Sequence, residues 1–272
     1  MLRPLLPVAL ALTLAGCPYT PVAEAVRHQP DPMAPALADE IVLLNWNIFK
    51  QVNNPEWQQE FRSLHAQFQP DLITLQEANL GPAHLAVAER HGYVFGPNLV
   101  LDEKQRSGVL TAANVNPSRY QTFLSDAREP LLSTAKVFVL TEYPIEQREE
   151  TLMVVNIHAI NFVSATTYNT QLFQLEQAVR EHQGPLILSG DFNSWSGARQ
   201  RQLTAMATSL GLQPVDFGDK LSATFMGQPL DHVLYSPHLE ADLAWIGHEF
   251  ESSDHYPMVV RFRIRDDAQQ AQ

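Results

Sequence analysis

Several apolar, strand-like runs in this sequence lead into polar side chains of the kinds that carry chemistry. In sheet-based α/β proteins, binding and catalytic sites commonly form where neighbouring strands end. These runs therefore predict a sheet protein whose site lies at strand ends. The runs, with their polar residues, are Ile41–Phe49 with Asn45 and Asn47, Asp71–Gln76 with Glu77, Thr151–His158 with His158, Pro185–Ser189 with Asp191 and Asn193, Asp231–Ser236 with Asp231, and Pro257–Ile264 with Asp254 and His255.

Helix-like segments alternate with these runs. Asn54 and Pro55 form a helix start, with an Asn cap and a proline at the first helical position. Trp57, Phe61 and further apolar residues follow at helical spacing. The pattern predicts one α/β domain over residues 39–265. The other predicted helices are Gly81–His91, Thr170–His182 and Gly197–Leu210, and the other predicted strands are Tyr93–Phe95, Gly108–Ala112, Ala135–Tyr143 and Leu243–Ile246.

The charge balance restricts the class of partner. The 272-residue chain carries a formal net charge of −12. Proteins that coat nucleic acid neutralise phosphates with Lys and Arg, so this balance argues against that class. It does not exclude an enzyme that meets an anionic substrate through a bound cation, because the cation reverses the local field.

The N-terminus has the layout of an export signal. Arg3 precedes an apolar stretch, and the run Leu14-Ala15-Gly16-Cys17 resembles a bacterial lipobox. Because Cys17 is the one cysteine of the chain, we expect residues 1–16 to be a signal peptide and Cys17 to be lipidated. Pro18 then favours an outer-membrane lipoprotein of the cell envelope. A plain signal peptide and a periplasmic or secreted protein remain the alternative.

The ends of the chain are predicted to lie outside the folded domain. Residues 17–38 are rich in proline and lack periodicity, which is typical of an extended tether. Residues 266–272 form a polar tail that we expect to be disordered.

The polar residues suit metal-assisted hydrolysis of a phosphoester. Carboxylate and amide oxygens are ligands that Mg²⁺ and Mn²⁺ prefer. A carboxylate beside an amide, as in Asp191 and Asn193, can hold and deprotonate a water molecule, and a histidine can move protons near neutral pH. Taken singly, each residue has a plain structural alternative: Gly190-Asp191-Phe192-Asn193 is composed of turn residues, and a lone histidine is more often structural.

The ordered set is far more specific than its parts. It resembles the endonuclease/exonuclease/phosphatase superfamily, and within it an uncharacterised bacterial branch. The matching segments, in the order of that superfamily, are NWNIFK, DLITLQEA, SGVLTAA, VVNIHAIN, GDFNSW, LDHVLYS and SSDHYPMVV. The resemblance implies a two-sheet β-sandwich, of α/β (α+β) class, flanked by helices on both outer faces. It also implies a site at one edge of the sandwich.

The resemblance also implies roles for individual residues. Glu77 would be the principal Mg²⁺ (or Mn²⁺) ligand, with Asn47 beside it and Asp254 as a further candidate. Asp191, assisted by Asn193, would orient and deprotonate the attacking water. The remaining catalytic assignments are His255 as the phosphate ligand, Asp231 as the residue that holds His255, and His158 as a general acid or phosphate ligand.

The basic residue that contacts the phosphate is the least defined part of the resemblance. Lys136 is the best candidate, followed by Arg106 and Arg128, and Asn161 is a weaker candidate for substrate contact. Six histidines without comparable context are interpreted as non-catalytic: His65, His84, His91, His182, His238 and His248.

Three functions are compatible with these residues. The first is a monomeric, Mg²⁺-dependent phosphodiesterase or nuclease, and the second is a phospholipid, sphingomyelin-type or inositol-type hydrolase at a membrane surface. The third is a module that binds phosphorylated ligands without catalysis, and the completeness of the polar set speaks against it.

Overall fold

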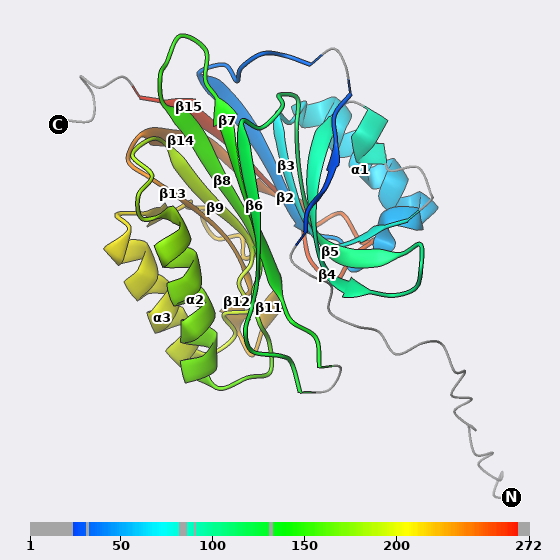
Figure 1. The fold of residues 1–272 in the computed structure, drawn as a ribbon, viewed down its shortest axis with the longest axis vertical. Helices are drawn as coiled ribbons and strands as arrows, with labels where there is room; N and C mark the ends of the chain where they lie inside the picture. The colour runs from blue at the N-terminus through cyan, green and yellow to red at the C-terminus, as the bar shows by residue number, and fades with distance from the viewer. Residues whose placement is uncertain (1–23, 31–32, 82–85, 90, 131–132, 266–272) are drawn as a thin grey trace, which may run out of the picture.

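Two β-sheets packed face to face form the centre of the protein (Figure 1). The computed structural model describes residues 24–265 apart from 31–32, 82–85, 90 and 131–132. The seven-stranded sheet contains, in spatial order, β1 (Val26–His28), β4 (Gly92–Val100), β5 (Arg106–Ala113), β3 (Leu72–Leu80), β2 (Glu40–Asn47), β15 (Met258–Ile264) and β14 (Leu239–Ile246). The six-stranded sheet contains β10 (Gln213–Pro214), β13 (Asp231–Tyr235), β9 (Leu186–Asp191), β8 (Thr151–His158), β7 (Val137–Pro144) and β6 (Arg119–Leu124). A separate hairpin joins β11 (Thr224–Phe225) to β12 (Gln228–Pro229).

Helices cover both outer faces of the sandwich, as the family resemblance implies. Helix α1 (Pro55–Phe68) buries Trp57, Phe61 and Leu64 against the seven-stranded sheet. Helices α2 (Ala165–Val179) and α3 (Gly197–Ser209) pack together on the six-stranded sheet. Figure 1 shows α1 on one side of the two sheets and the α2–α3 pair on the other.

The start of α1 forms as the local sequence predicts. The side chain of Asn54 accepts a hydrogen bond from the backbone N–H of Glu56, which satisfies one of the unpaired donors of the first turn. Pro55 occupies the first helical position, and Gln69 ends the helix in the left-handed conformation.

Four sequence-based expectations differ from the structure. The helix predicted at Thr170–His182 is α2, which begins at Ala165 and ends at Val179. Within the predicted helix Gly81–His91, the described residues contain a 3₁₀ turn at Ala86–Glu89. The strands β4 and β14 extend well beyond the predicted segments. Within the Pro-rich segment predicted as a tether, the described residues join the sandwich instead, because β1 pairs with β4 and Leu37 bridges to Ile145. Non-local pairing partners decide this, and the local sequence carries no sign of them.

A buried polar network crosses the sandwich. The side chain of Gln76, on β3, donates to Asn156 of the opposite sheet at 2.8 Å and to Asn45 at 2.9 Å. The hydroxyls of Thr74 and Ser189 lie 2.9 Å apart across the same interface. All five side chains are at most 1% exposed, and buried polar groups of this kind are costly unless paired. The network therefore fixes how the strand ends of the two sheets face each other.

Two further predictions concern residues that the structure leaves undescribed. Cys17 and the signal peptide 1–16, together with the tail 266–272, lie outside the described residues. Among the described residues, none of the helices has both the length and the apolar character that crossing a membrane requires.

Candidate active site

Strand register brings three of the predicted residues into one row. Asp191, at the end of β9, lies opposite Asp231 on β13 and opposite His158 on β8. Residues in register project to the same face of a sheet. Ser189 and Asn156, two positions earlier on their strands, face the other sheet, so this row also faces inward, at the edge of the sandwich.

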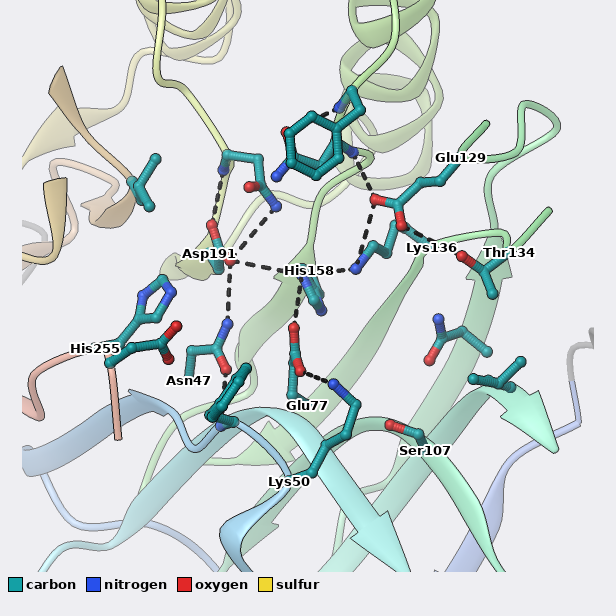
Figure 2. Close-up of a pocket in the computed structure, with 18 of the residues that line it drawn as sticks. Asn47, Lys50, Glu77, Ser107, Glu129, Thr134, Lys136, His158, Asp191 and His255 are labelled. Atoms are coloured by element: carbon teal, nitrogen blue, oxygen red, sulfur yellow. Dashed lines mark hydrogen bonds and ion pairs between the residues drawn. The ribbon is translucent and has the colours of Figure 1, made fainter. Parts of the chain in front are cut away.

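The opposite sheet contributes Asn47 and Glu77. Asn47 ends β2, and its side-chain amide donates to Asp191 Oδ2 at 3.1 Å. The pairing of β3 with β5 shifts register between Leu75 and Ala78, and Glu77 has a φ of +52° within this irregularity. A bulge redirects a side chain that regular alternation would turn away. Here the carboxylate of Glu77 reaches within 3.9 Å of His158 Nε2 (Figure 2).

Asp191 is, like Asp231, an almost fully buried acid of the site. Its Oδ1 accepts from the backbone N–H of Asn193 at 2.8 Å, and its Oδ2 lies 3.5 Å from His158 Nε2. Burial, together with the charge of Asp231, raises the pKa of Asp191 to about 7, although His255 opposes the shift. An acid with its pKa near neutrality can accept a proton from a bound water in that range.

His255 and Asp231 form a buried ion pair. His255 Nδ1 lies 2.8 Å from Asp231 Oδ2 and 3.0 Å from Oδ1. Burial alone would lower the pKa of His255, but the Asp231 carboxylate and its hydrogen bond, with Asp191 and Asp254 nearby, raise the pKa to about 10. His255 is therefore a cation at neutral pH, suited to bind a phosphate oxygen.

His158 lies in a different environment from His255. Lys136 Nζ is 2.9 Å from His158 Nε2, so the ammonium donates to a neutral imidazole. Burial, and then the nearby positive charge of Lys136, lower the pKa of His158 well below its usual value. In this arrangement His158 Nε2 accepts a hydrogen bond, and the charged ammonium of Lys136 donates it.

Glu129 and Lys50 are site residues that the sequence analysis missed. Glu129 Oε1 is 3.6 Å from Lys136 Nζ and accepts from the backbone N–H of Asn161 at 2.9 Å. Lys50 forms an ion pair with Glu77. Glu129 does not follow an apolar strand, which is the signal that identified the others, whereas Lys50 directly follows the run Ile41–Phe49. Lys50 falls within the quoted segment NWNIFK, where its place after Asn47 offered a hint.

The remaining candidates divide into two groups. Asp254 lines the same pocket and is exposed, and Asn161 lines it while accepting from Trp195 Nε1 at 2.8 Å. Arg106 and Arg128 do not line the pocket. Of the six histidines interpreted as non-catalytic, His84 lies outside the described residues and the other five are absent from the pocket wall.

These residues surround an open cavity of about 370 Å³ (Figure 2). Its polar floor holds Glu77, His158, Asp191 and His255. The aromatic residues of its wall are Phe49, Phe162, Trp195 and Phe225.

The polar floor fits a hard divalent cation. Glu77 forms an ion pair with the ammonium of Lys50, which shows that its carboxylate can bind a positive charge at this position. Asn47 Oδ1, beside it in the same pocket, accepts from the backbone N–H of Phe49 at 3.2 Å and offers a second oxygen. Asp191, Asp231 and His255 form another group whose ligand atoms lie within 4.8 Å of one another, but Asp231 and His255 bind each other. Glu77 and Asn47 are therefore the better candidates to hold Mg²⁺ or Mn²⁺.

Fold and site together define a phosphoester hydrolase of the sandwich type, and comparison with known proteins agrees. The model of the endonuclease/exonuclease/phosphatase family matches residues 44–255, and the chain belongs to this family. A UPF0294 protein of Vibrio cholerae serotype O1 is 38% identical over 232 residues, which cover 84% of this chain and 79% of that protein. This likeness agrees with the expected uncharacterised bacterial branch.

Solved structures show the same fold at low identity. The catalytic domain of human Nocturnin, solved with a bound sulfate anion, has a TM-score of 0.61 at 16% identity, and the match covers 89% of this chain and 97% of that domain. A family protein of Leptotrichia buccalis C-1013-b has a TM-score of 0.63 at 14% identity, covering 82% of this chain and all of that one.

Proposed function

We propose that the protein is a phosphodiesterase that depends on Mg²⁺ or Mn²⁺. The observation that carries the proposal is that Asp191, hydrogen-bonded to Asn47 and Asn193, and His255, paired with Asp231, line one pocket. Burial raises the pKa of Asp191 to about 7, and the Asp231 carboxylate raises the pKa of His255 to about 10. At neutral pH Asp191 can take a proton from water, and the His255 imidazolium can stabilise negative charge on the phosphate.

Side chains from both sheets have separate roles in the proposed reaction. Asp191 binds the attacking water together with Asn193, whose side-chain nitrogen lies 3.4 Å from Asp191 Oδ2. His255, held by Asp231, and Lys136, held by Glu129, bind phosphate oxygens. A cation on Glu77 and Asn47, when bound, would supply a Lewis acid that withdraws charge from the phosphate.

Hydrolysis of bis-p-nitrophenyl phosphate by the purified chain tests the proposal. We expect activity with Mg²⁺ or Mn²⁺, and a loss of at least about 100-fold in Asp191→Asn and in His255→Ala. Asp242→Asn, a substitution on β14 away from the pocket, serves as the matched control. Folded Asp191→Asn protein with wild-type rates would refute the assignment. Ligand binding without turnover by the wild type would favour the non-catalytic module.

We also propose that the mature chain is a monomer anchored through lipidated Cys17 in the cell envelope, most simply at the outer membrane. The lone cysteine within the lipobox-like run supports this. Cys17→Ala followed by membrane fractionation tests it: release of the protein is expected, and unchanged membrane association rejects lipidation.

A further inference from the structure

Large apolar side chains surround the mouth of the active-site pocket. Phe162 is 68% exposed, Phe225 50% and Phe49 49%, and all three line the pocket. Met226, 76% exposed, follows Phe225 at the tip of the β11–β12 hairpin. We call Phe49, Phe162, Phe225 and Met226 the apolar collar. Apolar side chains grouped in this way on a protein surface mark interaction sites.

The backbone beneath the apolar collar is strained. Phe49, Phe162 and Met226 have φ values of +45°, +51° and +52°, a region that non-glycine residues with bulky side chains rarely adopt. Such conformations persist at functional sites, where the surrounding fold compensates for them. Three different loops therefore bear a conformational cost while presenting apolar side chains to water.

Met226 is the clearest case. It and Gly227 form the two-residue turn of the hairpin, with φ values of +52° and +75°. Two positive φ values are the pattern of a type I′ turn, which strongly prefers Asn, Asp or Gly at its first position. Turn stability and solubility would both favour Asn at 226, so the methionine serves another purpose. Figure 1 places this hairpin near the lower ends of the sheet strands.

The charges of the pocket argue against a long nucleic acid as the partner of this collar. Lys50 and Lys136 are the lysines or arginines among the described lining residues; Lys136 is paired with Glu129, and Lys50 is paired with Glu77 until a metal ion takes that carboxylate. A polynucleotide carries phosphates on both sides of the cleaved one, and these need more cations than two lysines and one metal ion supply. The net charge of −12 likewise opposes anionic lipid surfaces.

We infer that the apolar collar docks on the surface of a zwitterionic phospholipid bilayer, so that a lipid headgroup phosphodiester enters the pocket. Apolar side chains inserted at the headgroup boundary provide the attraction, and no basic patch is required when the lipids carry no net charge. The inference of membrane docking depends only on the apolar collar, whereas cleavage of the headgroup phosphodiester rests on the proposed function.

Flotation with phosphatidylcholine vesicles, in the presence of EDTA, tests docking without catalysis. The protein is the chain from residue 17 with Cys17→Ser, which keeps every described residue and carries no lipid. We expect Met226→Asn, which suits the turn, to weaken vesicle binding about tenfold through loss of apolar insertion. Phe173→Asn, a 56%-exposed position on α2 away from the pocket, is the control and should bind as the wild type does.

The outcomes separate the two proposals. Failure of the wild type to bind the vesicles, or equal weakening by Met226→Asn and Phe173→Asn, overturns the docking. Preferential binding of a single-stranded oligonucleotide, weakened by Met226→Asn, assigns the collar to nucleobases and also overturns it. Met226→Asn should leave hydrolysis of soluble bis-p-nitrophenyl phosphate unchanged. Vesicle binding that depends on Met226, in a protein without any hydrolytic activity, would sustain the docking and reject the proposed function.

Discussion

Substitution of Asp231 by Asn should move the pKa of His255 through neutrality. In the wild type, the Asp231 carboxylate holds the imidazolium at 2.8 Å and raises the pKa of His255 to about 10. The rise from 6.5 to about 10 corresponds to roughly 5 kcal/mol of preference for the charged form, taken as an upper limit for a buried pair. Without the carboxylate, burial dominates and lowers the pKa below 6.5.

The assay is a pH profile of kcat/KM on bis-p-nitrophenyl phosphate, together with NMR titration of the His255 imidazole. The wild type should be active from about pH 7, above which Asp191 is ionised, until the pH rises through about 10, whereas Asp231→Asn should lose at least about 100-fold at pH 8 and recover partly toward pH 7. Phosphate binding should follow the same profile, because it requires the imidazolium.

The pH dependence of folding stability should show the same titration of His255. Because the folded pKa of His255 is raised, its contribution is complete below pH 6.5 and is lost as pH rises through about 10. Asp231→Asn should remove this alkaline loss. A variant whose imidazole still titrates near pH 10, or whose activity has an unchanged alkaline limit, would refute the reasoning.

Three further predictions concern other parts of the site. Gly190→Ala should destabilise the fold by more than about 3 kcal/mol, because a Cβ would lie 2.0 Å from the carbonyl oxygen of Ile157; Gly211→Ala, in open space, should cost about 1 kcal/mol in urea unfolding. His232→Gln should remove an acid-dependent loss of stability. Burial lowers the pKa of His232 to about 4, so the free energy of unfolding of the wild type falls by up to roughly 3 kcal/mol between pH 6.5 and 4. An unchanged pH dependence of the unfolding free energy in the variant would contradict this. Glu129→Gln should lower kcat/KM about tenfold with little change in melting temperature, and should have no added effect in a Lys136→Met background; additive losses would show that Glu129 acts separately.

The sequence by itself determined the fold class and most of the polar floor. The apolar runs that contain or precede Asn47, His158 and Asp191 have the composition of strands, and strand ends collect side chains at one edge. The cap at Asn54 and the apolar face of α1 are likewise local, so they could be recognised without a structure.

Only the tertiary structure decided which side chains meet. The positive φ of Glu77 depends on a shift in pairing between β3 and β5. The Lys50–Glu77 ion pair and the hydrogen bond from the Asn161 backbone to Glu129 join segments far apart in the chain. The pairing of β1 with β4, which removed much of the predicted tether, is equally non-local. Local propensity specifies conformation within a segment, whereas register, bulges and burial arise from partners that the segment does not contain.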